Sequence, residues 1–312
     1  MEISILLAEQ ILAMFLTMAV GFGVVRAGLF KTEDSRIISN MVVYICNPCV
    51  VVHSFQIELT DDKIKGLMIA IGLSVVVHMV LIIGSEILSF IFHFNSIEKA
   101  SIIYTNAGYL VIPLVGAVLG EEWVFYTTPF TLVQTVLMWT HGVKLIGQEK
   151  ELNIRKILCN PNVIAMIIGI ALFALEIRLP TVVDSCVSGF GDMISPASMM
   201  VIGMVIGDVD LKWVFRQKRP YLICLLRLIV FPLIAVVAFA GLERSGIHPD
   251  AEYILMIVLI ATSAPAAAMI TQLAQIYGKD SRYASVINVM SVIFCIITMP
   301  VMVLSYEMLI AL

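Results

Sequence analysis

The most informative part of the sequence is Tyr104-Thr105-Asn106-Ala107-Gly108-Tyr109-Leu110-Val111-Ile112-Pro113, a polar segment with glycine and proline inside the apolar run 100–119. A second segment of this kind, Ala261-Thr262-Ser263-Ala264-Pro265-Ala266-Ala267-Ala268, lies inside the apolar run 253–277. A proline within a helix removes one backbone hydrogen bond and clashes with the preceding turn. Both segments therefore predict helices that are broken near their middle.

The chain as a whole is too apolar for a soluble domain. Of its 312 residues 60% are hydrophobic and 13% are charged, and the mean hydropathy is +1.01. A helix that crosses a bilayer needs about 20 mostly apolar residues. The sequence offers ten such runs: 3–25, 37–55, 67–92, 100–119, 123–146, 163–179, 182–206, 221–242, 253–277 and 283–312. We therefore expect an all-α integral membrane protein with ten transmembrane helices, although Glu176 and Arg178 in the sixth run leave a nine-helix count open.

The two halves of the chain carry helix-breaking residues at matching positions. Asn47-Pro48 in the second run corresponds to Ser195-Pro196 in the seventh at an offset of 148, and Pro113 corresponds to Pro265 at an offset of 152. Residues 1–150 and 160–312 are therefore predicted to be two repeats of five helices. Because five is odd, the second repeat enters the membrane from the opposite side. Inverted repeats with interrupted helices are typical of secondary transporters.

The basic residues predict the orientation of the chain, because lysine and arginine are enriched in cytoplasmic loops. The connections after the odd-numbered runs hold fourteen of them and the other connections hold four. The fourteen are Arg26, Lys31, Arg36, Lys99, Lys144, Lys150, Arg155, Lys156, Lys212, Arg216, Lys218, Arg219, Lys279 and Arg282; the four are Lys63, Lys65, Arg178 and Arg244. We expect a multi-pass protein of the cell (plasma) membrane with both termini outside the cytoplasm.

If the two broken helices cross, two half-helix N-termini point at one spot near the bilayer midplane. Each end carries roughly half a positive charge and free amides, which attract a carboxylate without a buried cation. The candidate substrate-binding residues are Asn106, Tyr109, Pro113, Ser263, Pro265, Ala266 and Gln272 in the broken helices, with Asn47 and Ser195 beside the other two prolines. The alternative is that these prolines only bend helices and improve their packing.

Ionisable residues inside the runs are further candidates, because a charge in the membrane is costly and often functional. Asp192, one turn before Ser195-Pro196, and Glu9 are the candidates for coupling to an ion, which would be a proton or sodium; no other cofactor is expected. His78 is expected to be neutral and hydrogen-bonded. Glu86 and Arg227 lie within two turns of the cytoplasmic ends, where long side chains are expected to reach the interface.

Several short motifs together resemble the auxin efflux carrier family in its short prokaryotic form. They are Tyr44 to Cys49 around Asn47-Pro48, Asn106-Ala107-Gly108-Tyr109 through Ile112-Pro113-Leu114, Asn160-Pro161-Asn162, Pro196-Ala197-Ser198-Met199 followed by Gly203, and Pro265-Ala266-Ala267 followed by Tyr277-Gly278. The resemblance covers essentially the whole chain. It implies a scaffold-type domain from helices 1, 2, 6 and 7, and a transport-type domain from helices 3–5 and 8–10 that moves like an elevator, often in a homodimer.

The resemblance also implies substrates such as malonate, malate or an auxin-like acid, bound through Asn106, Tyr109, Pro113 and the neighbourhood of Pro265. The partners expected are this carboxylate, the lipid bilayer and a second copy of the chain, with no nucleic acid. The long cytoplasmic loop of the plant carriers is absent, because the connection 147–160 is short.

Two other classes of protein stay open. A passive anion channel would also use helix dipoles at its binding sites. An intramembrane aspartyl protease would need a Gly-x-Gly-Asp motif, which Gly189-Phe190-Gly191-Asp192 matches, but a second aspartate motif on a preceding helix is missing. We therefore expect a transporter and no enzyme.

Overall fold

The computed structural model describes residues 2–147, 155 and 158–311, and these residues are almost entirely helical. The helices are α1 Glu2–Arg26, α2 Ser35–Met41, α3 Asn47–Ser54, α4 Asp61–Phe92, α5 Ser96–Ile103, α6 Ile112–Leu119, α7 Glu121–Val124, α8 Thr128–Leu137, α9 Val143–Gly147, α11 Pro161–Ala174, α12 Thr181–Asp192, α13 Ile194–Gly207, α14 Leu211–Arg216, α15 Arg219–Leu225, α16 Phe231–Glu243, α17 Ala251–Ser263, α18 Met269–Ile276 and α19 Ser281–Ile310. Short 3-10 or π turns join several of them: η1 Thr32–Asp34, η2 Val42–Cys46, η3 Ala107–Val111, η4 Phe125–Thr127, η5 Met138–Gly142 and η6 Leu226–Val230.

Among the described residues, six helical segments are long and apolar enough to cross a membrane. They are Glu9–Arg26, Thr32–Ser54, Asp61–Phe92, Thr181–Gly207, Arg219–Glu243 and Ser281–Ile310, and three shorter apolar helices are Ala107–Leu119, Pro161–Ala174 and Ala251–Ser263. Helices lie over each of the ten predicted runs. Lys150 and Lys156, which contributed to the predicted orientation, and Leu312, the predicted end of the last run, lie outside the described residues.

Three prolines within the helices follow a widened turn. The π turns η2, η3 and η6 each end two residues before a proline, which is Pro48, Pro113 or Pro232. A proline lacks the amide hydrogen and its ring clashes with the carbonyl four residues earlier, and a π turn accommodates this conflict without ending the helix. The prediction that Asn47-Pro48 disturbs its helix is thus met by a local π turn, whereas the chain unwinds before Pro113.

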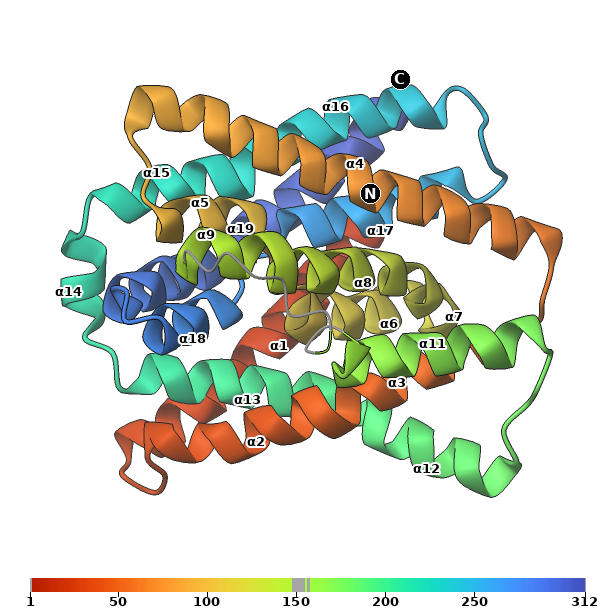
Figure 1. The fold of residues 1–312 in the computed structure, drawn as a ribbon, viewed down its shortest axis with the longest axis horizontal. Coiled ribbons are helices and arrows are strands. Elements are labelled where there is room, and N and C mark those ends of the chain that lie inside the picture. Colours follow the sequence, from red (N-terminus) through yellow and green to blue (C-terminus); the bar gives the residue numbers. More distant parts are fainter. Residues whose placement is uncertain (1, 148–154, 156–157, 312) are drawn as a thin grey trace.

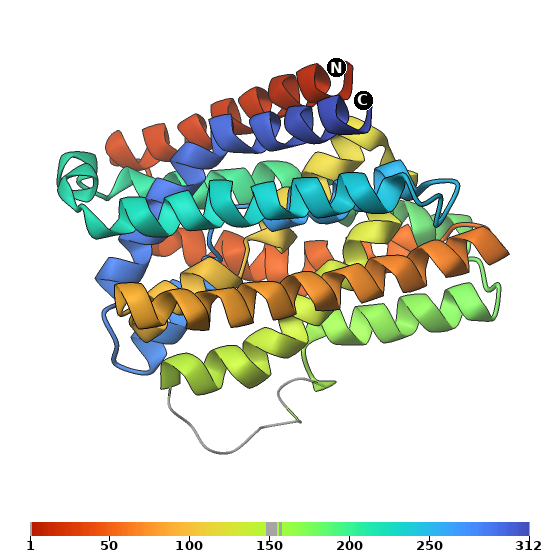
Figure 2. The same cartoon turned by 90° about the horizontal axis from the view of Figure 1, so that it is seen from above.

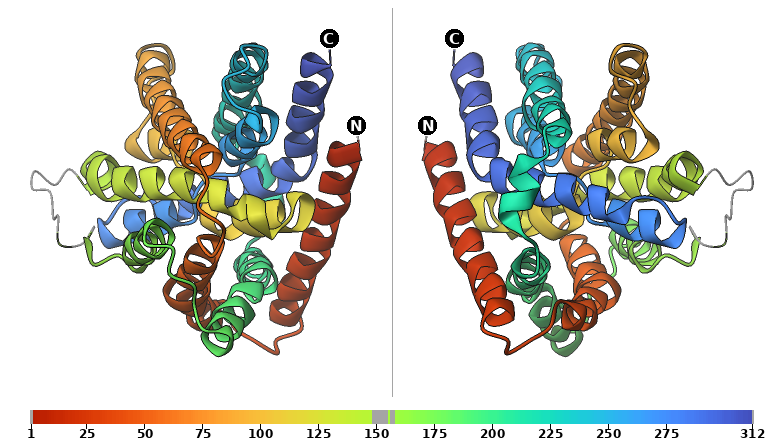
Figure 3. Two further views of the ribbon diagram at one scale, coloured as in Figure 1. Left: turned by 90° about the vertical axis from the view of Figure 1, so that its right-hand side faces the viewer. Right: turned by 90° about the vertical axis from the view of Figure 1, so that its left-hand side faces the viewer.

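The long helices run roughly along one direction (Figures 1 and 2), and both ends of the described chain lie at the same end of the bundle (Figure 2). One set of helices packs largely within itself: α1 against α13, α3 against α11 and α12, and α2 against α13. Another set includes α4 with α8 and α17, and α16 with α17 and α19. Helices α1 and α19 lie side by side and bridge the two sets, as the end-on views show (Figure 3).

Helix α1 approaches α13 at backbone contact distance. A Cβ atom on Gly203 would lie 1.9 Å from the carbonyl oxygen of Met18, and one on Gly21 would lie 2.3 Å from that of Met200. Glycine at these positions therefore sets the distance between the two helices, since any side chain would force them apart.

The outward face of α4 is apolar. Its exposed side chains include Met68, Val75, Val76, Met79, Val80, Ile83, Ile87 and Phe90. A contiguous apolar face of this length is typical of contact with lipid.

Two expectations for charged and titratable side chains are tested by these packing contacts. His78 was predicted to be neutral and hydrogen-bonded; it is buried, and its Nδ1 lies 2.7 Å from the carbonyl oxygen of Ser74, which confirms the hydrogen bond. The prediction for Arg227 is wrong: its side chain is fully buried and does not reach the interface. The reason is that α15 and η6 pack against α5 and α19, which cover this side of the helix.

Candidate functional site

The two predicted breaks pair with one another in the middle of the bundle. Thr105 and Ala266 form an antiparallel bridge. The amide of Asn106 donates to the carbonyl oxygen of Pro265 at 2.8 Å, and that of Ala267 donates to Tyr104 at 3.0 Å. Two unwound segments from opposite halves of the chain therefore cross, and they satisfy part of each other's backbone hydrogen bonds where helix geometry is lost.

Polar side chains satisfy further backbone groups, one residue on each crossing segment. The amide and hydroxyl of Thr105 donate to Oε1 of Gln134 at 2.8 and 2.9 Å, and Nε2 of Gln134 donates back to the carbonyl oxygen of Thr105 at 2.8 Å. On the other segment, Nδ2 of Asn288 donates to Ala266 at 2.6 Å, and the Ala266 amide donates to Oγ of Ser291 at 3.1 Å. Each crossing segment is thus fixed by a neighbouring helix, α8 or α19.

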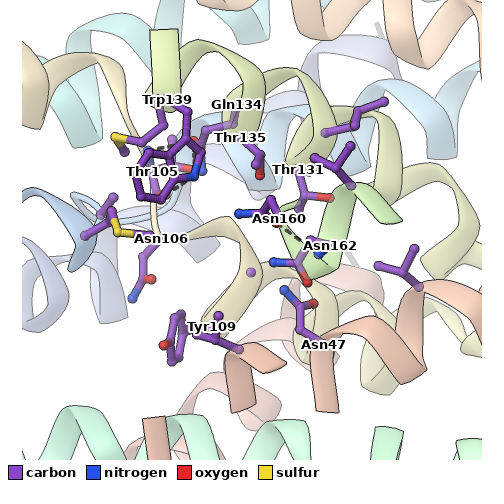
Figure 4. A pocket seen from close by; sticks show the side chains of 18 of the residues that line it. Asn47, Thr105, Asn106, Tyr109, Thr131, Gln134, Thr135, Trp139, Asn160 and Asn162 are labelled. Carbon is purple, nitrogen blue, oxygen red and sulfur yellow. Dashed lines mark hydrogen bonds between the residues drawn. The ribbon is translucent and has the colours of Figure 1, made fainter. Parts of the chain in front are cut away.

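A cavity of about 120 Å³ opens beside the crossing (Figure 4). Its polar lining consists of Asn47, Thr105, Asn106, Tyr109, Thr131, Gln134, Thr135, Asn160 and Asn162, and its apolar lining includes Val43, Val51, Leu132, Met138, Trp139, Val163 and Met166. Among the described residues that line it, none carries a charged side chain. Any charge selectivity here must come from dipoles and hydrogen-bond donors.

The N-terminal ends of two half-helices reach this cavity. Gly108 and Tyr109 belong to the turn that leads into α6, and Ala268 and Met269 form the start of α18. Unpaired backbone amides at such ends give a positive potential. The cavity therefore combines two positive helix ends with neutral side chains, and this combination favours an anion.

Carboxamide groups dominate one wall of the cavity, where Asn47, Asn160 and Asn162 lie next to one another (Figure 4). Oδ1 of Asn160 accepts from the amide of Asn162 at 2.9 Å and so caps α11. The Oδ1 atoms of Asn47 and Asn162 are buried and have no hydrogen-bond partner among the described residues. Buried polar atoms of this kind call for a ligand or water.

Tyr109 and Asn106 form the facing part of the lining, on the segment that follows the crossing. The hydroxyl of Tyr109 lies 3.0 Å from Oγ of Ser39 on α2. Gly108 lies between these two residues in the sequence, and a Cβ on Gly108 would approach Nδ2 of Asn47 to 3.3 Å. The absent side chain keeps the carboxamide of Asn47 close to the broken helix.

The structure brings only part of the predicted substrate-binding set together. Asn47, Asn106 and Tyr109 line the cavity. Pro265 and Ala266 supply backbone to the crossing, and Ser263 is buried behind it with its hydroxyl unpartnered among the described residues. Pro113 and Ser195 line a different cavity, and Gln272 is exposed on α18.

That second cavity, of about 220 Å³, is lined in part by His53, Pro113, Glu121, Asp192 and Ser195. Nδ1 of His53 lies 2.9 Å from Oδ1 of Asp184. Asp192 lines this second cavity and not the first one, which we call the carboxamide cavity after Asn47, Asn160 and Asn162. Glu9 is exposed on α1. The second cavity holds titratable side chains, whereas the first holds neutral ones.

Several lining residues were not among the predicted ones: Thr131, Gln134, Thr135, Trp139, Asn160 and Asn162. A signal for some of them existed, because Thr131, Gln134 and Thr135 follow one another at helical spacing in an apolar run. From the sequence, Asn160 and Asn162 were noted only as part of the motif Asn160-Pro161-Asn162. Their place beside the crossing depends on how α11 packs on α3 and α8.

Comparison with known proteins gives one family match, to a family model described as a membrane transport protein. The model matches the chain twice, over residues 6–154 and 149–303. Between them the two matches cover nearly the whole chain, including the carboxamide cavity and the crossing segments. No curated protein sequence matches the chain significantly.

Proposed function

The chain belongs to the membrane transport protein family, that of the auxin efflux carriers, and we propose that it is a secondary transporter of a small organic anion. The observation that carries this proposal is the uncharged polar cavity at two half-helix N-termini. A carboxylate placed there would accept hydrogen bonds from backbone amides and from the carboxamides of Asn47, Asn106 and Asn162.

The proposed substrate is a small carboxylate such as malonate, malate or an auxin-like acid. The cavity volume of about 120 Å³ fits a small molecule. Its lining divides into a carboxamide wall, which can bind a carboxylate, and an apolar wall with Met138 and Trp139, which can contact the carbon skeleton of the acid.

For the architecture we propose ten membrane-spanning helices in a five-plus-five inverted repeat, with the broken helices α5–α6 and α17–α18 as the crossover pair. The helices that pack around α1, α3 and α13 would form the scaffold-type domain and the others the transport-type domain. Both termini would be extracytoplasmic in the cell membrane, and the chain would form a homodimer. The paired breaks support the crossover pair, and the two packing groups support the division into two domains.

For the mechanism we propose alternating access by an elevator-like movement. Helix α3 lines the first cavity with Asn47 and Val51 and the second with Val50 and His53. Neighbouring turns of one segment also contribute to both linings, Tyr109 in the first cavity and Pro113 in the second. Movement of the crossing by about one or two helical turns of 5.4 Å would carry the bound anion from one cavity to the other.

The coupling ion is proposed to be a proton or sodium, with Asp192 and Glu9 as candidate residues. Asp192 is the stronger of the two because it lines the second cavity. Asp192→Asn should keep substrate binding and lose the dependence of flux on the ion gradient. A variant whose flux still follows the gradient as the parent's does would remove Asp192 from the coupling mechanism.

The test of the function is flux in proteoliposomes with a panel of mono- and dicarboxylates, with and without proton and sodium gradients. We expect saturable uptake of at least one acid that is lost in Asn106→Ala and retained in Gln272→Ala, because only Asn106 lines the cavity. Flux of none of the acids would reject the substrate class, and ohmic single-channel currents would favour a passive channel instead.

A further inference from the structure

Arg227 is the largest fully buried side chain of the described residues. It lies in the π turn η6, inside the apolar segment Arg219–Glu243. A guanidinium group keeps its proton in proteins, so a positive charge is enclosed in the bundle. Charges enclosed in membrane segments are costly and mark functional positions. Single π turns inside helices are also frequent at functional sites.

The contacts of Arg227 do not include an acidic side chain among the described residues. Nη1 donates to the carbonyl oxygen of Ile102 at 3.2 Å, and Nε and Nη2 have no partner among the residues that the structure describes. The titratable groups that face it are His78 on α4 and Cys295 on α19. Its charge must therefore be balanced by something other than a carboxylate.

The carbonyl that Arg227 contacts belongs to the last turn of α5, which ends at Ile103 directly before the crossing. The last carbonyls of a helix lack intrahelical partners and give its end a partial negative charge. The other broken helix ends close by, because Sγ of Cys295 donates to the carbonyl oxygen of Ser263, the last residue of α17, at 3.7 Å. Negative ends of two half-helices thus lie near one buried cation.

We propose that Arg227 is a built-in counter-cation that balances the C-terminal ends of α5 and α17 and thereby holds the crossing in place, so that no bound metal ion is needed there. Arg227 is a positioning residue. It lies outside the lining of the carboxamide cavity and acts on that cavity through the crossing. This inference rests on the geometry of the crossing and holds whichever anion is carried.

A purely structural role would give a different result on substitution. Well-packed apolar residues of similar volume can replace buried ion pairs with a neutral or stabilising effect, so Arg227→Met should not destabilise the protein if the charge of Arg227 balances nothing. Removing a counter-charge leaves the helix ends unbalanced and destabilises the crossing. The variants Arg227→Met, Arg227→Lys and Arg227→Ala therefore separate the two roles.

The experiment measures thermal unfolding of the purified full chain in detergent, with hydrogen exchange at residues 104–106 and 264–268 as a local readout. We expect Arg227→Met to lower Tm by at least about 2 °C, since a single interaction shifts the Tm of a large chain less than that of a small domain, and to speed exchange at both segments. Arg227→Lys, which keeps the charge, should retain most of the Tm. Millimolar ethylguanidinium should raise the Tm of Arg227→Ala, because a ligand that binds only the folded state stabilises it.

The matched control is Arg244→Ala. Arg244 also donates to a carbonyl in the last turn of a helix, that of Leu309 at 2.8 Å, but this contact is exposed. Ethylguanidinium should leave the Tm of the Arg244→Ala protein unchanged. An Arg227→Met protein as stable as the parent, equal rescue of both alanine variants, or failure of Arg227→Lys to fold would each overturn the proposal. Failure of Arg227→Met alone to fold would support it.

Discussion

Gln134 and Thr105 are joined by three hydrogen bonds between 2.8 and 2.9 Å, which use both the carbonyl and the amide end of the glutamine side chain. Thr105 is also the residue that bridges to Ala266 in the other half of the chain. A single side chain of α8 therefore replaces the backbone partners that Thr105 would have had in an unbroken helix.

The first prediction concerns this contact. In Gln134→Leu the amide and the carbonyl of Thr105 both lose their partner, and each unsatisfied buried group costs about 1–3 kcal/mol. We expect a clear fall in the free energy of unfolding together with loss of carboxylate flux. Thermal unfolding and flux on the same preparation measure the two effects.

The control for that change is Gln272→Leu at an exposed position of α18, which should leave both quantities close to those of the parent. A Gln134→Leu protein with normal stability and normal flux would mean that the crossing does not depend on the hydrogen bonds between Gln134 and Thr105.

The second prediction uses the helix contact between α1 and α13. Gly21→Ala places a Cβ 2.3 Å from the carbonyl oxygen of Met200, whereas a Cβ at Gly23, two residues further along the same helix, meets nothing within 4 Å. Overpacking costs about 1–3 kcal/mol, while glycine to alanine in an open helix position gains up to about 1 kcal/mol. Gly21→Ala should lower the Tm and Gly23→Ala should raise it slightly; equal shifts would contradict the close contact.

The third prediction concerns the charge of the cavity. Asn47→Asp introduces a carboxylate of nearly the same shape into a lining without charged side chains among the described residues. Repulsion of an anionic substrate should weaken binding at least about tenfold, or about 1.4 kcal/mol. Lowering the pH should restore part of the affinity as the new carboxyl group becomes protonated. Unchanged affinity for every carboxylate of the panel would place the anion elsewhere.

The fourth prediction concerns pH and Glu98, which lies at the start of α5 outside the apolar spans. Burial raises the pKa of Glu98, but hydrogen bonds from Arg219 at 2.8 Å, the Asn95 amide at 2.9 Å and the Tyr283 hydroxyl at 2.8 Å outweigh burial, so the pKa lies below its usual range. The unfolded chain therefore binds a proton at a higher pH than the folded protein does.

It follows that the contribution of Glu98 to stability is complete above its unfolded pKa of about 4.3 and is lost as the pH falls through the lower folded pKa. In Glu98→Gln the Tm at neutral pH should be lower and its decline below about pH 4 should be shallower than in the parent. Parallel Tm profiles for the two proteins would show that Glu98 is not stabilised by these contacts.

The sequence by itself determined the helical, membrane-embedded class, because mean hydropathy and the spacing of apolar runs depend only on composition and order along the chain. It also located both helix breaks, since proline and glycine act locally on the backbone, and its motifs predicted the family that the match confirms. Asn47, Asn106 and Tyr109 were predicted because they stand in or beside those breaks, and the structure places them in the lining of the cavity.

Only the tertiary structure decided which other side chains meet at the breaks. The side chains of Asn160, Asn162 and Gln134 reach the cavity because α11 and α8 pack beside the crossing. Gln272 is exposed on α18 instead, and Asp192 lies in the second cavity. The burial of Arg227 was likewise decided by the tertiary structure. Its distance from a helix end predicts a side chain at the interface, but α5 and α19 enclose it. Periodicity fixes a position along one helix, whereas burial and partnership depend on the neighbours that cover each face.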